Sequence, residues 1–196
     1  MQSIRESKAV QPKETSRLFK RVRSQRGFVI WLTGLSGAGK TTIGRALTQH
    51  LTSQGLKAEF LDGDDLRSTI SSELGFSKQD REMHARRVAY ISHLLSRNGV
   101  IAIVALISPY RSFRQYARNL VETFIEVWIN CSLETCIKRD PKGLYRKAIE
   151  GMVSDMTGLQ SPYEQPINPE VRINTDIETP QESVIRIVEY LNEELI

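Results

Sequence analysis

The sequence is poor in cysteine and contains no long apolar run. Its 196 residues include two cysteines, Cys131 and Cys136, whose spacing is not C-x-x-C. We interpret them as reduced packing residues, one at a strand end and one in the following helix. No stretch approaches the roughly 18 apolar residues of a membrane span, and the polar N-terminus lacks the apolar segment of a signal peptide. These absences predict a cytoplasmic protein without membrane contact, and the length predicts a single domain.

The positively charged N-terminus contains a single aromatic residue, Phe19. Residues 1–26 hold eight of the 27 basic and two of the 23 acidic side chains, so the remainder has 19 basic and 21 acidic groups. A basic arm can bind nucleic acid or an acidic surface. No aromatic residues alternate with its charges, as a stacking platform would require. We therefore favour a solvated lead-in over residues 1–26 and expect no nucleic-acid partner.

Short apolar segments predict strands, and helical patterns lie between and after them. The segment 100–107 is apolar at every residue, which is typical of a parallel strand with both faces covered. Strands that alternate with helices predict an α/β protein with a doubly wound parallel sheet and helices on both faces. The predicted strands are 28–33, 57–62, 100–107 and 124–131, and the predicted helices include 41–51, 80–98 and 179–195.

The last predicted helix has a clear start signal. Thr179 can cap it, Pro180 suits its first turn, and Glu182 completes a capping box. Its apolar stripe comprises Val184, Ile187, Leu191 and Leu195.

Residues 139–170 show little strand or helix signal. They hold four prolines, three glycines and many charges. A stretch of this length is usually a functional lid or disordered. We favour a lid within a domain of residues 27–196, because Lys142, Arg146 and Lys147 lie in it.

The segment "GLSGAGKT" fits the phosphate-loop pattern G-x-x-x-x-G-K-[ST] and follows an apolar strand directly. Glycines allow backbone N–H groups to surround phosphate oxygens, and the next helix begins near Lys40 with its positive dipole end. Lys40 should reach the β- and γ-phosphates, and the Thr41 hydroxyl should bind Mg²⁺. The residues predicted to bind ATP here are Gly34, Leu35, Ser36, Gly37, Ala38, Gly39, Lys40, Thr41 and Thr42.

Other phosphate-loop classes lack their signatures here. There is no N-K-x-D guanine reader of a GTPase, and "DMTG" at 155–158 has no long apolar strand before it. Only the loop itself resembles the LSGGQ signature of an ABC-type ATPase. A compact chain with a basic lid favours a kinase of small metabolites, which must keep water from the transferring phosphoryl group.

Three carboxylates gather where the second predicted strand ends. In doubly wound sheets, ligands bind beyond the carboxyl ends of the strands. In an extended segment Asp62 and Asp64 would share one face, beside Mg²⁺ and an acceptor hydroxyl. We expect Asp62 to serve the metal, Asp64 to act as base, and Asp65 to cap the next helix. Arg67, about one helical turn past Asp64, could bind an anionic acceptor. The alternative for the whole segment is a polar turn with a helix cap.

The helix 80–98 carries polar residues on its core-facing stripe. Arg81 and His84 continue the face of Val88, Ile91 and Leu95. An arginine there needs an anionic partner, which could be substrate or a local acid such as Glu82. A histidine in this position is more often structural.

Taken together, these segments resemble the adenylylsulfate kinase family. The resemblance runs from about residue 27 to near the C-terminus and rests on collinear motifs. These are "WLTGLSGAGKTT", "LDGDDLR", "LGFSKQDR", the Arg86–Arg87 pair, "LISPYR", "RDPKGLY" and "TGLQSPYEQP". It implies that MgATP phosphorylates the ribose 3′-hydroxyl of adenosine 5′-phosphosulfate (APS), in sulfate assimilation, in a homodimer.

The resemblance also implies residue roles. Phe76 would stack on the APS adenine, Arg67 and Arg81 would hold its phosphosulfate, and Arg139 would lie beside the ATP adenine. Ser108 corresponds to a position described as a phosphoserine in bacterial members, although its place after a strand predicts an exposed substrate contact. The further substrate contacts that it implies are at Asp62, His84, Ile107, Lys142, Leu144 and Met156.

Two residues depart from the family pattern. His84 replaces the usual Asn, and Met156 replaces an aromatic residue that faces the substrate base. There are two alternatives to APS phosphorylation: a kinase of another small hydroxyl compound, and a non-catalytic ATP-binding regulatory domain. Intact Lys40, Thr41 and the two acids argue against the second.

Overall fold

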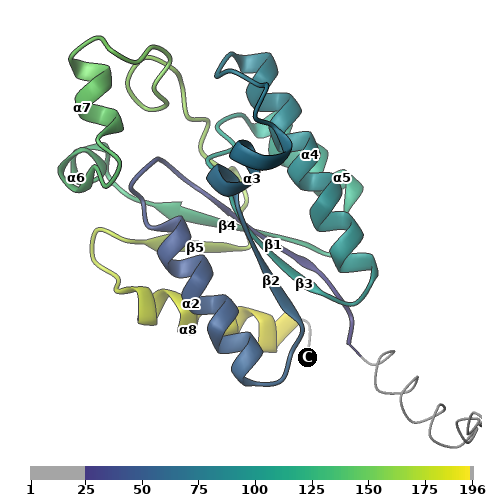
Figure 1. Ribbon diagram of the computed structural model, residues 1–196. Coiled ribbons are helices and arrows are strands. Elements are labelled where there is room, and N and C mark those ends of the chain that lie inside the picture. Colours follow the sequence, from purple (N-terminus) through teal and green to yellow (C-terminus); the bar gives the residue numbers. More distant parts are fainter. Residues whose placement is uncertain (1–24, 195–196) are drawn as a thin grey trace, which may run out of the picture.

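The fold is a five-stranded parallel sheet between two layers of helices (Figure 1). The computed structural model describes residues 25–194, so most of the basic arm and Leu195 lie outside the described residues. The strand order is β2-β3-β1-β4-β5, and every neighbouring pair is parallel. The strands are β1 (Val29–Thr33), β2 (Ala58–Asp62), β3 (Ile101–Ala105), β4 (Phe124–Asn130) and β5 (Val171–Asn174). This confirms the predicted doubly wound α/β fold.

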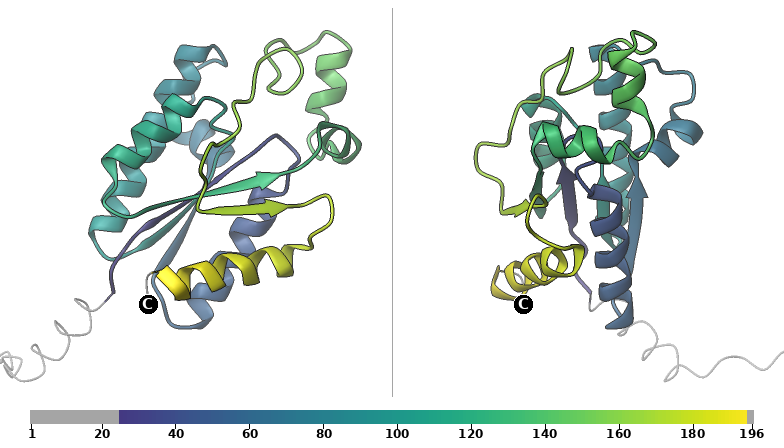
Figure 2. Two further views of the ribbon diagram at one scale, coloured as in Figure 1. Left: turned by 180° about the vertical axis from the view of Figure 1, so that it is seen from behind. Right: turned by 90° about the vertical axis from the view of Figure 1, so that its left-hand side faces the viewer.

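Helices cover both faces of the sheet (Figure 2). The helices α2 and α8 pack together on one face, and α4 and α5 pack together on the other. The helices are α2 (Lys40–Ser53), α3 (Gly63–Ile70), α4 (Lys78–Arg97), α5 (Arg111–Leu120), α6 (Leu133–Arg139), α7 (Leu144–Ile149) and α8 (Pro180–Glu194). None of the helices within residues 25–194 is long and apolar enough to cross a bilayer.

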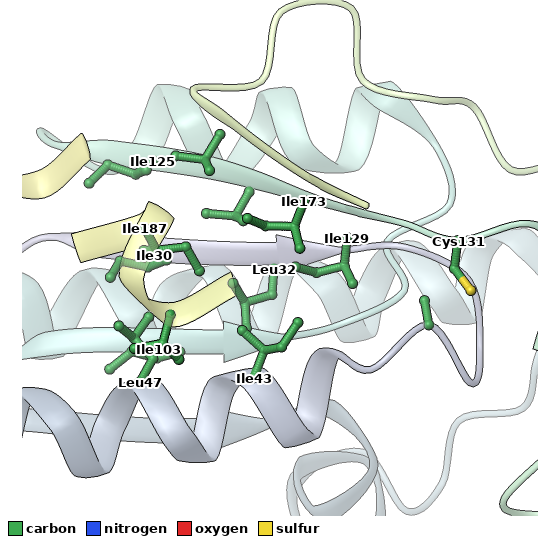
Figure 3. Packing of buried hydrophobic residues seen from close by; sticks show 14 of the residues in the cluster. Ile30, Leu32, Ile43, Leu47, Ile103, Ile125, Ile129, Cys131, Ile173 and Ile187 are labelled. Carbon is green, nitrogen blue, oxygen red and sulfur yellow. The ribbon is translucent and has the colours of Figure 1, made fainter. Parts of the chain in front are cut away.

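Alternating side chains of β1 supply two separate cores. Ile30 and Leu32 pack with Ile43 and Leu47 of α2 and with Ile187 of α8 (Figure 3). The intervening Val29 and Trp31 belong to the core under α4 and α5. Because both faces are covered, the strand is apolar at nearly every position, as its sequence predicts.

The start of α8 confirms the predicted capping box. Thr179 Oγ1 accepts a hydrogen bond from the Glu182 N–H at 3.2 Å, and Glu182 Oε2 accepts one from the Thr179 N–H at 2.8 Å. The stripe residues Val184, Ile187 and Leu191 are buried.

The segment 139–170 is more ordered than its composition suggests. It contains the end of α6 and the whole of α7, whose Tyr145 is fully buried. Tyr145 donates to the Ser36 carbonyl at 3.1 Å and so ties the segment to the phosphate loop. The two cysteines are free and buried, Cys131 directly after β4 and Cys136 within α6, as predicted.

Candidate active site

A cavity of about 710 Å³ lies beyond the carboxyl ends of β2 and β3, beside the loop that follows β1. Its walls come from the phosphate loop, α3, the turn after β3, the segment between α6 and α7, and the loop before α8. The position agrees with the rule that ligands bind at this edge of an open parallel sheet.

The phosphate loop is shaped by its glycines. Gly39 adopts a left-handed conformation (φ 102°) as the residue before α2. A Cβ on Gly34 would lie 2.3 Å from the Ile129 carbonyl oxygen, so only glycine fits there. The loop residues that line the cavity are Ser36, Gly37, Gly39, Lys40, Thr41 and Thr42. Leu35 and Ala38 instead pack against the core, so a side-chain role in ATP binding is not supported for them.

Lys40 is half-buried within this loop. Its Nζ donates to the carbonyls of Gly34 at 2.9 Å and Leu35 at 2.7 Å. Burial lowers the Lys40 pKa to about 8, and the nearby Asp64 carboxylate opposes this shift. The ammonium lies where a polyphosphate cradled by the loop would meet it.

The acidic turn differs from its predicted geometry. The strand ends at Asp62 and α3 begins at once with Gly63, so there is no extended segment in which Asp62 and Asp64 alternate. Asp62, not Asp65, caps α3: its Oδ1 accepts from the Asp64 N–H at 3.0 Å. Asp64 and Asp65 fall in the first helical turn, where the dipole favours negative charge. The three acids are nevertheless inequivalent, as expected.

Asp62 and Thr41 form the candidate metal position. Thr41 Oγ1 donates to Asp62 Oδ2 at 3.1 Å, and Asp62 is 8% exposed. No group of three or more His, Cys, Asp or Glu side chains able to hold a metal occurs in the described part of the chain. Mg²⁺ in kinases takes one or two protein oxygens and otherwise water and substrate phosphates. The residues present therefore fit Mg²⁺ bound together with a nucleotide.

Asp64 faces the opposite wall of the cavity. It forms an ion pair with Lys142, between α6 and α7, and both side chains are at least half exposed. Lys142, Leu144 and Arg139 all line the cavity. Arg139 is held by Thr175, donating to its carbonyl at 2.6 Å.

An aromatic ring and two cations meet where α3 and the start of α4 border the cavity. The Phe76 ring is 62% exposed, with the guanidinium carbons of Arg67 and Arg81 at 5.1 and 5.9 Å from its centre. Neither arginine has an ion-pair partner among residues 25–194, and burial lowers the pKa of both. Arg81 does not pair with Glu82; its head group donates to Thr157 Oγ1 and to two backbone carbonyls. This cationic wall suits an anionic, aromatic substrate.

Ser108 is not exposed, contrary to expectation. It is 2% exposed, and its Oγ accepts from Trp31 Nε1 at 2.9 Å and donates to Thr33 Oγ1 at 3.2 Å. The strand stops at Ala105, and these two hydrogen bonds join Ser108 to β1. Ile107 and Ser108 still line the cavity.

His84 and Met156 do not line the cavity, which corrects their expected contact with substrate. Met156 is buried with the core residues beneath the phosphate loop. His84 is 1% exposed and lies between Gly63, whose carbonyl is 3.0 Å from Nε2, and Ser71, whose hydroxyl is 3.0 Å from Nδ1. A carbonyl can only accept, so Nε2 carries the proton and Nδ1 accepts from Ser71. The histidine is structural: it joins α3 to α4.

Acid should destabilise the protein through His84. Burial, aided by the charge of Arg67, lowers the His84 pKa to about 4, whereas an unfolded chain protonates histidine near pH 6.5. The stabilisation is complete above the unfolded pKa and is lost as pH falls from 6.5 to 4, because only the unfolded state binds the proton there. Thermal unfolding should show a larger fall in Tm between about pH 7 and about pH 5 for the wild type than for His84→Asn.

His50, which is exposed on α2, provides the control. The Tm of His50→Asn should change with pH in the same way as that of the wild type. An equal pH dependence in all three proteins would contradict the assignment.

One wall of the cavity was not predicted from the sequence. It is lined by Thr175 and Glu178, between β5 and α8, and by Pro180, the first residue of α8. Thr175 Oγ1 donates to the Ala38 carbonyl at 2.9 Å, across 137 positions of sequence. The short strand β5 was not predicted, so nothing indicated that this loop returns to the phosphate loop.

The parallel sheet has a phosphate loop after β1, acids after β2, which is two strands away from β1, and a cationic wall beside them. Together these features define a phosphate-loop kinase of small molecules. The particular family follows from comparison: residues 26–174 match the family model described as adenylylsulphate kinase. The chain therefore belongs to the adenylylsulfate kinase family and is a phosphotransferase.

Named relatives agree. An adenylyl-sulfate kinase of Picosynechococcus sp. is 49% identical over 168 residues, covering 86% of this chain and 95% of that protein. A probable adenylyl-sulfate kinase of Pyrococcus abyssi is 53% identical over 162 residues, covering 83% and 93%. The APS kinase CysC of Mycobacterium tuberculosis, solved with AMPPNP and APS, superposes with a TM-score of 0.83 at 37% identity, covering 86% of this chain and 99% of that one.

Proposed function

We propose that this protein transfers the γ-phosphoryl group of ATP to the ribose 3′-hydroxyl of APS, giving 3′-phosphoadenosine 5′-phosphosulfate and ADP. The observation that carries the proposal is that one cavity joins the phosphate loop to Phe76, Arg67 and Arg81. The loop supplies a triphosphate cradle, the ring a surface for an adenine, and the two guanidiniums a countercharge for phosphosulfate. An uncharged sugar would leave both arginines without partners.

Each residue has a defined part in direct transfer. The acceptor oxygen attacks the γ-phosphorus, its proton passes to the Asp64 carboxylate, and the bond to the ADP oxygen breaks. Lys40 stabilises the charge that develops on the transferring group. Mg²⁺, held at Thr41 and Asp62 together with phosphate oxygens, would neutralise the triphosphate. Residues 139–170 would act as a lid through Lys142 and Arg139.

A different acceptor has less support than the sequence suggests. The reason to consider one was the pair of departures at His84 and Met156. Neither side chain lines the cavity. The homodimer implied by the family resemblance stays a prediction.

The decisive experiment is to incubate the purified protein with MgATP and APS and to identify the products by mass. The expected products are ADP and 3′-phosphoadenosine 5′-phosphosulfate in equal amounts. ADP without a phosphorylated APS would reject the acceptor, and no ADP release at all would favour a non-catalytic nucleotide-binding domain.

Removing the Phe76 ring should weaken APS binding selectively. Stacking of a base on an aromatic side chain is worth about 1–3 kcal/mol, so Phe76→Ala should raise the Kd for APS by about tenfold or more. The Kd for ATP should change little, because the phosphate loop remains intact. Calorimetric titration with each ligand measures both constants.

Tyr90→Ala is the matched control for Phe76. Tyr90 is 54% exposed on α4 and does not line the cavity. Its removal should leave both constants unchanged. Equal weakening of ATP and APS by Phe76→Ala would place Phe76 among the residues that support the fold.

A further inference from the structure

Arg114 of α5 is a buried arginine that joins three segments of the chain. Its side chain is 3% exposed. Nε donates to Glu126 Oε1 of β4 at 2.6 Å. Nη1 donates to the Ser108 carbonyl at 2.6 Å, and Nη2 donates to the Glu164 carbonyl at 2.6 Å. All three nitrogens of the head group are thereby used, each by a different segment.

The turn at residues 107–109, called here the Ser108 corner, is linked to residues 164–165 by further bonds. The Glu164 N–H donates to the Pro109 carbonyl at 2.8 Å. Arg111 makes two more hydrogen bonds to this segment. Its backbone N–H donates to Glu164 Oε2 at 2.8 Å, and its Nε donates to the Gln165 carbonyl at 2.9 Å. This part of the predicted lid, residues 164–165, is therefore fixed to the Ser108 corner.

The Ser108 corner is a wall of the active-site cavity. Ile107, Ser108 and Pro109 all line it. Ser108 has φ 39°, a value that non-glycine residues adopt only when their surroundings enforce it. Tyr110, the residue after the corner, lies beneath Lys78, whose Nζ is 4.7 Å from the centre of the ring. Lys78 is the first residue of α4, the helix that carries Arg81. The corner therefore lies on the side of the cavity that Arg81 lines, and not on the side that Arg139 and Thr175 line.

A buried ion pair is weak evidence for stability, because desolvation offsets the attraction between its charges. What a guanidinium provides is direction: its planar fork fixes several acceptors at once, which the single ammonium of lysine cannot do. We propose that Arg114 is a positioning residue for the acceptor, holding the strained Ser108 corner and residues 164–165 in one arrangement. The proposal rests on the proposed function, since the acceptor is taken to be APS.

The test compares Arg114→Lys with Arg118→Lys by steady-state kinetics, with ATP and APS varied in turn. Arg118 lies one turn further along α5, shares Glu126 and donates to Glu170, but makes no contact with the Ser108 corner. Arg114→Lys keeps the charge and loses the fork. It should raise the KM for APS about tenfold or more, the scale of a small misplacement of a bound substrate. The KM for ATP should change by less than about threefold. Arg118→Lys should lower the Tm and leave both KM values near the wild type.

A milder variant covers the case in which Arg114→Lys does not fold. Glu164→Ala removes the carboxylate that binds the Arg111 N–H and leaves the Arg114–Glu126 pair in place; it should also raise the KM for APS alone. Equal increases in the two KM values, an equal effect of Arg118→Lys, or an unchanged KM for APS in Glu164→Ala would each overturn the inference. Wild-type protein that does not phosphorylate APS would instead reject the proposed function.

Discussion

Lys40→Ala is expected to lower turnover by at least about 10²-fold, the scale of one lost electrostatic stabiliser in an active site. The transferring phosphoryl group spreads negative charge over its equatorial oxygens, and the lysine of a phosphate loop lies beside them. The Lys40 ammonium is half-buried and donates to the carbonyls of Gly34 and Leu35. ADP release under saturating APS measures the effect.

Lys138→Ala is the control for the loss of a lysine. Lys138 is 72% exposed and pairs with Glu134 on the surface of α6. Such a pair contributes about 0–1 kcal/mol to stability, so this variant should turn over at nearly the wild-type rate. Turnover of Lys40→Ala within about threefold of the wild type would remove the phosphate-loop assignment.

Asp62→Asn and Asp64→Asn should each depress turnover by about 10²-fold or more, the range of general acid–base catalysis. Asn caps a helix as well as Asp does, so Asp62→Asn should keep the start of α3 while losing the charge beside Thr41. Raising Mg²⁺ should partly restore Asp62→Asn, because its defect is weaker metal binding. The same addition should not restore Asp64→Asn, whose defect is the missing proton acceptor.

Asp65→Asn supplies the matched control within the same turn. Asp65 lies in the first turn of α3 with Asp64 and is neither the cap nor the partner of Lys142. Its variant should be nearly as active as the wild type. If Asp65→Asn is the inactive variant, the roles assigned to the three acids are wrong. Thermal unfolding of all three variants separates a lost charge from a lost fold.

Local patterns carried much of the fold. The four strands that were predicted agree with the structure to within two residues at every end, because each is a short apolar run closed by a turn. The strand β5 was missed, since four residues that include Arg172 and Asn174 give little apolar signal. Helix α7 was missed because prolines and glycines surround it, and the burial of Tyr145 stabilises it from outside the segment.

The part of the candidate site that was predicted best is the phosphate loop, whose binding geometry is formed by the backbone of the motif itself. The glycines of the phosphate loop, Lys40 and Thr41 act through a turn that they themselves form. The geometry of "DGDDLR" was wrong because the helix starts one residue after the strand. Sequence spacing alone does not show where an extended segment gives way to a helix.

The sequence by itself determined the class of fold, the phosphate loop and the set of residues from which an acceptor site is made. Only the tertiary structure decided which of those residues line the cavity and which are buried and support the fold. His84 and Met156 became packing residues, Ser108 became buried against Trp31, and Arg114 joined the Ser108 corner to Glu164. The reason is physical: a motif is stabilised by hydrogen bonds among near neighbours, whereas burial depends on segments that are distant in sequence and meet only when the sheet and its helices have assembled.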